Sequence, residues 1–88
     1  MTTTLTAPVD LRGRLARTRV LFGPHETNLG DAARTITERH VAYYALRAAG
    51  GAGVIVTETA SVHASDHPYA YAPAAAPAAA GWAAVASA

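Results

Sequence analysis

A single strand–helix–strand pattern, spanning residues 18–59, constrains this chain more than any other feature. A short apolar run at 20–22 precedes a polar loop and a helical segment, and a second apolar run follows at 54–56. This βαβ unit is the building block of parallel sheets, which bury both faces and contain many such units. The fold class is therefore α/β, and the chain is interpreted as the opening of a larger domain, truncated after its second strand.

The first strand ends at Gly23 and Pro24, because proline cannot continue a ladder inside a sheet. Residues 25–34 are polar and contain several turn-forming residues, so they are expected to form a loop. The second strand, at 54–56, is strongly β-branched and follows the helical segment after a very short link.

The helix between the strands is expected to begin near Thr35. Thr35 and Glu38 have the spacing of a capping box, in which each side chain satisfies a backbone N–H of the other residue. Apolar residues recur at helical spacing at Val41, Tyr44, Ala45 and Ala48. Gly50 and Gly51 are expected to end the helix.

The two strands are expected to be parallel, since a crossover of this kind is right-handed in nearly all proteins. Their carboxyl ends, at 23–26 and 57–61, then lie on one edge of the sheet. Ligands of parallel α/β folds bind at that edge. These two segments are therefore the candidate binding site.

Composition narrows the function classes. The net charge of +1 indicates no nucleic-acid or membrane-surface partner, and the absence of cysteine excludes disulfides and cysteine-ligated zinc. No apolar run approaches the ~20 residues of a membrane span. Residues 1–8 lack the features of a secretory signal, so a cytoplasmic protein is expected. The 23 alanines, and seven basic residues that are all arginine, indicate a GC-rich bacterial gene.

The two ends of the chain carry weaker signals. Residues 1–10 are expected to form a loose arm. Residues 11–17 are expected to be a solvated segment that leads into the first strand, and the alternative is that their arginines contact a phosphate. From 70 to 88, 12 of 19 residues are alanine, which predicts a poorly ordered tail or a frayed helix. Because alanine buries little area, an independent cooperative fold is not expected.

The pieces of the pattern resemble the old yellow enzyme family, the NADH:flavin oxidoreductases. Residues 19–25 resemble that family's first strand and read Arg-Val-Leu-Phe-Gly-Pro-His. The stretch 38–62, with Arg-Ala-Ala-Gly-Gly and Gly-Val-Ile-Val-Thr-Glu-Thr, is similar to its next helix and second strand. The chain is most similar to the subgroup that contains 2,4-dienoyl-CoA reductase and trimethylamine dehydrogenase. The run at 24–30 also resembles oxidoreductases associated with the mycofactocin redox system.

This resemblance covers residues 11–82 and implies a TIM (β/α)8 barrel with FMN at the carboxyl ends of its strands. Residues 1–88 would be the N-terminal βαβ portion of that FMN-binding domain. NAD(P)H would reduce the flavin of the intact parent, which would act on a small-molecule substrate. The identity of that substrate, the choice between NADH and NADPH, and the oligomeric state stay open.

By position, the resemblance implies that Gly23, Pro24, His25 and Glu26 contact the flavin, and that Thr59 lies beside its pyrimidine edge. Relatives often have cysteine or threonine in place of Glu26, and a carboxylate beside the ring would disfavour the anionic reduced flavin. Thr59 stands where alanine is common. The family's catalytic residues and phosphate site come from later strands, so no catalytic residue is assigned.

The other polar residues have plainer interpretations. The histidines at 25, 63 and 67 match no metal-binding spacing, so no metal site is predicted. His40 is expected to be structural. Glu58 is expected to pair with an arginine or a backbone N–H, with a general base as the alternative. Tyr69 and Tyr71 come too early to be the family's proton donor.

Two function classes follow. The first is an N-terminal fragment of an FMN-dependent oxidoreductase, inactive by itself. The alternative is a small non-enzymatic α/β interaction module, or a truncated product, that binds no flavin.

Overall fold

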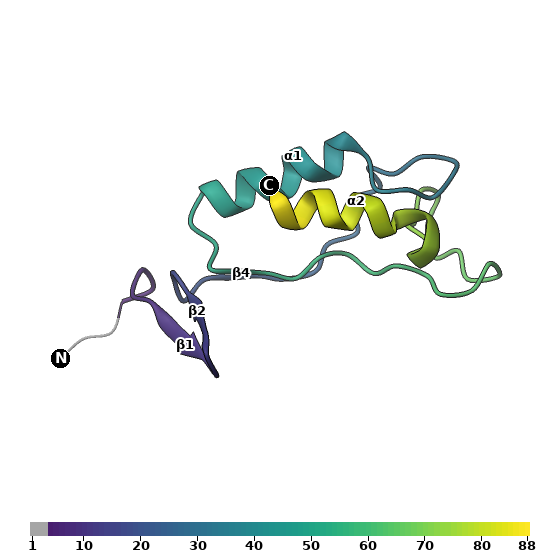
Figure 1. Cartoon of the computed structure of the whole chain (residues 1–88). Helices are drawn as coiled ribbons and strands as arrows, with labels where there is room; N and C mark the ends of the chain where they lie inside the picture. Colours follow the sequence, from purple (N-terminus) through teal and green to yellow (C-terminus); the bar gives the residue numbers. More distant parts are fainter. Residues whose placement is uncertain (1–3) are drawn as a thin grey trace.

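The computed structural model describes residues 4–88, which form two small sheets and two helices (Figure 1). The elements are β1 (Val9–Leu11), β2 (Arg14–Ala16), β3 (Leu21–Phe22), α1 (Glu38–Ala49), β4 (Val54–Ile55) and α2 (Ala75–Ser87). Figure 1 shows the β1–β2 hairpin at one end and the two helices side by side at the other. The molecule is elongated, with extents of 51 × 21 × 20 Å.

The predicted parallel pairing is confirmed. β3 and β4 pair in parallel, with Leu21 opposite Val54 and Phe22 opposite Ile55. The backbone N–H of Gly53 donates to Val20 at 2.9 Å, directly before the paired residues. A Cβ at Gly53 would lie 2.2 Å from the carbonyl oxygen of Thr18. Only glycine therefore fits where the segments that lead into β3 and β4 pass each other.

Helix α1 begins two to three residues later than predicted, and its cap differs. Thr37 is the N-cap, and its N–H donates to Nδ1 of His40 at 3.0 Å. Histidine therefore takes the role that the capping box gives to glutamate. Thr35 is unavailable for this role, because its N–H and hydroxyl donate to Asp31 at 3.0 and 2.7 Å.

The stretch predicted to be a poorly ordered tail contains helix α2. Ala78 is fully buried, and a Cβ at Gly81 would lie 2.3 Å from Cβ of Ile36. The Trp82 ring lies 6.2 Å from that of Tyr44, between ring centroids. The small side chains of α2 therefore allow close packing on α1 and on the segment that leads into it, a contact that the alanine count alone does not reveal.

The sequence interpretation missed the β1–β2 hairpin. Residues 1–3 of the predicted loose arm lie outside the described residues, but Val9 and Asp10 pair with Ala16 and Leu15. The two-residue turn consists of Arg12 and Gly13, with φ of 54° and 96°. Positive φ at both central positions is typical of the type I′ turn, which suits the twist of a hairpin.

No helix in the part of the chain that the structure describes is long and apolar enough to cross a membrane.

Candidate functional site

A buried carboxyl group organises the carboxyl edge of the parallel strands. Glu58 follows β4 and is 3% exposed. Its Oε1 accepts the hydroxyl of Thr27 at 2.7 Å, and its Oε2 accepts the Thr27 N–H at 3.2 Å and the Tyr69 hydroxyl at 2.5 Å. Buried polar groups require such partners. The predicted backbone N–H partner of Glu58 is thus confirmed, whereas its other partners are Thr27, Tyr69 and a histidine, and not an arginine.

That histidine is His40, which lies against Glu58 from helix α1. The Nε2 atom of His40 is 2.9 Å from Oε1 of Glu58, and both side chains are fully buried. Because Nδ1 of His40 accepts the Thr37 N–H, the proton of the neutral ring lies on Nε2 and faces the carboxyl group. The Nε2–H bond of His40 does not point at the carboxyl oxygen within hydrogen-bond geometry, so the contact is electrostatic. This agrees with the structural role expected for His40.

Two tyrosines complete the surroundings of Glu58. The Glu58 N–H donates to the hydroxyl oxygen of Tyr44 at 3.0 Å. Burial raises the pKa of Tyr44, and burial together with the hydrogen bond to Glu58 raises that of Tyr69. Both phenols therefore stay protonated at neutral pH and serve here as hydrogen-bonding groups.

The predicted flavin-contacting residues lie exposed at this edge. Gly23, Pro24, His25, Glu26 and Thr59 are all exposed. The bonds between Thr27 and Glu58 bring together the two segments that carry these residues, because Thr27 directly follows Glu26 and Glu58 directly precedes Thr59. A Cβ at Gly23 would meet nothing within 4 Å, so the backbone there has room for a flat ring. The flavin-contacting role of these residues stays a prediction.

His25 is held by helix α1. Its Nδ1 is 3.0 Å from the Tyr43 hydroxyl, and the two rings stack with centroids 6.2 Å apart. The Arg47 guanidinium lies 4.0 Å from the centroid of the Tyr43 ring on the same helix. A cation over an aromatic face is attracted by the ring quadrupole. The stack fixes the place of His25 beside the edge.

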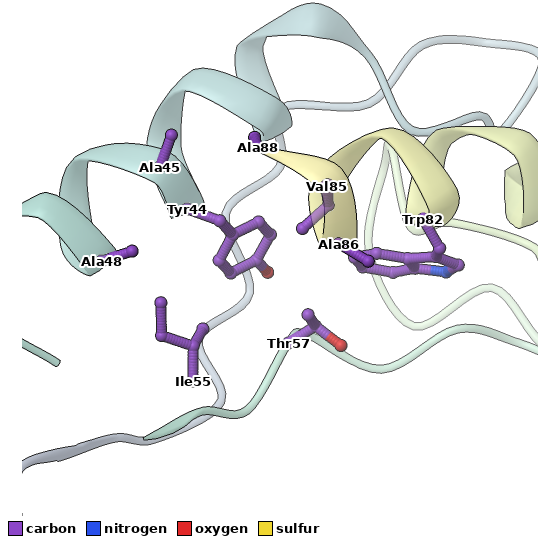
Figure 2. Close-up of a pocket in the computed structure, with 9 residues that line it drawn as sticks. All are labelled: Tyr44, Ala45, Ala48, Ile55, Thr57, Trp82, Val85, Ala86 and Ala88. Atoms are coloured by element: carbon purple, nitrogen blue, oxygen red, sulfur yellow. The ribbon is translucent and has the colours of Figure 1, made fainter. Parts of the chain in front are cut away.

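An apolar cavity of about 510 Å³ lies between α1, β4 and α2 (Figure 2). Its lining residues are Tyr44, Ala45, Ala48, Ile55, Thr57, Trp82, Val85, Ala86 and Ala88. Figure 2 shows the Tyr44 ring reaching from α1 toward Thr57, with Trp82 and Val85 approaching from α2. The cavity borders β4 on the helix-covered face, and none of the predicted site residues lines it. Among residues 4–88 no group of three or more His, Cys, Asp or Glu side chains is placed to hold a metal.

Sequence reasoning missed Thr27, Tyr43 and Tyr69 as parts of this site. The available signal was Glu58 itself, since a carboxyl group after a buried strand needs several donors. The identity of those donors depends on how the loops at 25–34 and 62–73 fold back, which no local pattern determines.

The fold and this edge define an α/β unit with a parallel strand pair and a buried carboxyl network at its carboxyl end. This unit is similar in fold to the solved structure of a variant of NCR from Zymomonas mobilis, with a TM-score of 0.82 and 24% sequence identity. The match covers 98% of this chain and 29% of that one, so the chain spans less than a third of its structural neighbour. No family model and no curated protein matches the chain.

Proposed function

We propose that this chain is the N-terminal βαβ portion of an FMN-binding TIM barrel, in an NAD(P)H:flavin oxidoreductase of the old yellow enzyme family. One observation carries the proposal. The bonds between Thr27 and Glu58 unite the two segments that resemble the flavin-contacting segments of that family, at the edge where parallel α/β folds bind ligands. The structural neighbour NCR is a member of the same family.

In this proposal, the chain supplies one side of the flavin site. Gly23 offers an uncrowded backbone for the ring, with Pro24 directly after it, and His25 is positioned by its contact with Tyr43. Glu26 and Thr59 flank the ring from the two strands. Bound FMN would supply hydride transfer from NAD(P)H to a small-molecule substrate. Glu58 would hold the two flanking segments in register.

The chain is proposed to be inactive by itself. β3 and β4 form a sheet of two strands, and the apolar cavity beside β4 is open. Parallel sheets are stable when both faces are covered and further strands are paired. Later strands would fill this space and bring the catalytic residues, as in the subgroup of 2,4-dienoyl-CoA reductase and trimethylamine dehydrogenase, or in the mycofactocin-associated oxidoreductases. We place the parent protein in the bacterial cytoplasm.

The second candidate is a non-enzymatic interaction module. Large apolar side chains are exposed on and beside the open strand pair, with Leu21 61%, Val56 41% and Val20 40% exposed. Such side chains suit a partner that adds a strand to the sheet. This candidate predicts strand-like binding of a protein and no affinity for flavin.

A chimera distinguishes the two candidates. The chain replaces the matched 29% of the NCR variant, and FMN binding is followed by flavin absorbance and fluorescence. We expect stoichiometric FMN binding by the chimera and none by the 88-residue chain alone. Thr59→Trp should block binding by filling the edge, whereas Leu46→Trp, on the exposed face of α1, should not. A chimera with a native-like circular dichroism spectrum and no flavin would refute the proposal. Tight binding by the chain alone would refute its inactivity as an isolated fragment.

A further inference from the structure

A second hollow, of about 530 Å³, lies between the loop that follows β4 and the N-terminus of α2. Its lining residues are Arg34, Ser61, Val62, His63, Ala64, His67, Ala74, Ala75, Ala76 and Pro77. The lining contains one arginine and two histidines, but neither aspartate nor glutamate. It therefore holds no acidic side chain, and each of its polar side chains can donate a hydrogen bond.

Arg34 brings a fixed positive charge to this hollow. Its Nε donates to the carbonyl oxygen of Ala72 at 2.8 Å, and its Nη2 to that of Asp66 at 2.9 Å. These two bonds orient the guanidinium and use only part of its five N–H donors. Within residues 4–88, the one acid–base pair at salt-bridge distance is His40 with Glu58, so Arg34 has no carboxylate counter-ion there.

Ser61 brings a buried hydroxyl that lacks a partner. The residue is 5% exposed, and its Oγ has no hydrogen-bond partner among the described residues. Its backbone is held firmly, because its N–H donates to Pro73 at 2.9 Å and its carbonyl accepts the Ala75 N–H at 2.8 Å. A buried hydroxyl without a partner costs free energy, which a ligand in the hollow would recover once the serine side chain rotates toward it.

Two further donors come from His63 and from the start of α2. The Ser65 N–H donates to Nδ1 of His63 at 3.1 Å, so the neutral ring carries its proton on Nε2, which is free to donate outward. Helix α2 has 13 residues, with no side-chain cap and no acidic residue in its first turn. The N–H of Ala75 is taken by Ser61, and Pro77 has none, so Ala76 keeps a donor at the positive end of the helix dipole.

We propose that this hollow is an oxyanion site that binds the phosphate or carboxylate group of a small molecule. Arg34 would supply the charge, and Ser61, His63 and Ala76 would supply hydrogen bonds. Ser61 lies two residues after Thr59, but the site shares no residue with the proposed flavin contacts and does not depend on them. The bound group is that of a substrate, because the resemblance implies that later strands hold the FMN phosphate, and the test checks FMN as the other source.

The test titrates the full 15N-labelled chain with inorganic phosphate at constant ionic strength, with chloride as the control ion. Saturable shifts are expected at the amides of Ser61, His63 and Ala76. Ser61→Ala and Arg34→Gln should each weaken phosphate binding about tenfold or more, because each removes hydrogen bonds to a charged group. Arg39→Gln is the matched control, because Arg39 is an exposed residue of helix α1. This variant should bind phosphate as the parent chain does.

Ser61→Ala keeps the test decisive if Arg34→Gln fails to fold, because the serine hydroxyl has no partner to lose. Shifts that fail to saturate, equal shifts with chloride, or unchanged affinity in Ser61→Ala would each overturn the proposal.

Titrations with FMN and with riboflavin identify the source of the anion. Competition with phosphate by FMN but not by riboflavin would assign the site to the flavin phosphate and overturn its assignment to a substrate. Phosphate binding that FMN leaves unchanged assigns the site to a substrate. Phosphate binding without any flavin binding in the chimera would refute the flavin proposal alone, and the reverse result would refute the oxyanion site alone.

Discussion

Thr27 donates both its backbone N–H and its hydroxyl to the carboxyl group of Glu58, across 31 positions of sequence. One short polar side chain thereby joins the loop after β3 to the segment after β4. The joint lies one residue from Glu26 and one from Thr59. The geometry of the proposed flavin edge therefore depends on a pair whose carboxyl group is buried.

Thr27→Val should destabilise the folded chain by about 1–3 kcal/mol, because it leaves a buried carboxyl oxygen without one of its donors. Urea unfolding followed by circular dichroism measures this loss. Thr59→Val, at an exposed position one residue beyond Glu58, is the control and should change stability by less than about 0.5 kcal/mol. If Thr27→Val lowered the free energy of unfolding no more than Thr59→Val does, the Thr27–Glu58 hydrogen bonds would contribute nothing to stability.

Asp31 should make stability sensitive to acid. The Thr35 N–H and hydroxyl donate to its carboxylate and hold its pKa below the usual 3.8. A lowered pKa contributes stability above 3.8 that is lost as the pH falls through the folded-state value. Urea midpoints measured from about pH 5 downward should fall less in Asp31→Asn than in the parent chain. Identical pH profiles would contradict the assignment.

Tyr69 should make the stability of the chain sensitive to alkaline pH. Burial and the bond to Glu58 raise its pKa above the usual 10.0, so its contribution to stability is complete below pH 10 and is lost as the pH rises through the folded-state value. Tyr69→Phe should remove this alkaline loss and cost about 1 kcal/mol at neutral pH. Phenolate absorbance and urea unfolding measure the two effects. Tyr71→Phe, 43% exposed, is the control and should retain the alkaline loss.

Gly81→Ala should destabilise the contact between α2 and Ile36. Alanine normally favours a helix over glycine, but the new Cβ would lie 2.3 Å from Cβ of Ile36. Overpacking of this kind costs about 1–3 kcal/mol. Gly23→Ala, where a Cβ meets nothing within 4 Å, should be nearly neutral for stability. A stabilised Gly81→Ala chain would show that α2 does not pack here.

The parallel strand pair and its connecting helix could be predicted because they depend on local signals. The apolar runs, Pro24 and the paired glycines at 50–51 each act within a few residues. The shared edge then followed from the handedness of βαβ crossovers. Its flavin-contacting role stays a prediction that rests on the resemblance.

The helix cap and the C-terminal helix could not be predicted in the same way. Thr35 has the right spacing for a cap, but Asp31 binds it from the preceding loop, and His40 replaces the expected glutamate. For residues 70–88 the sequence predicts only a poorly ordered tail or a frayed helix, because the alanines and Gly81 of α2 carry little hydrophobic signal. These small residues stabilise the fold because they allow α2 to approach Ile36 closely, which is a tertiary contact that no local pattern shows. The β1–β2 hairpin depends on Arg12 adopting positive φ, which arginine rarely does.

The sharing of Glu58 among two loops and two side chains from helix α1 has a kinetic consequence. Thr27, His40, Tyr44 and Tyr69 all contact the same residue, so none can leave without exposing its buried carboxyl group or its amide. The amides of Thr27 and Glu58 should then exchange with solvent at one common rate, set by a single opening event. A molecule that binds at this edge would slow the exchange of both amides together. A slower exchange rate at either amide would therefore detect its binding.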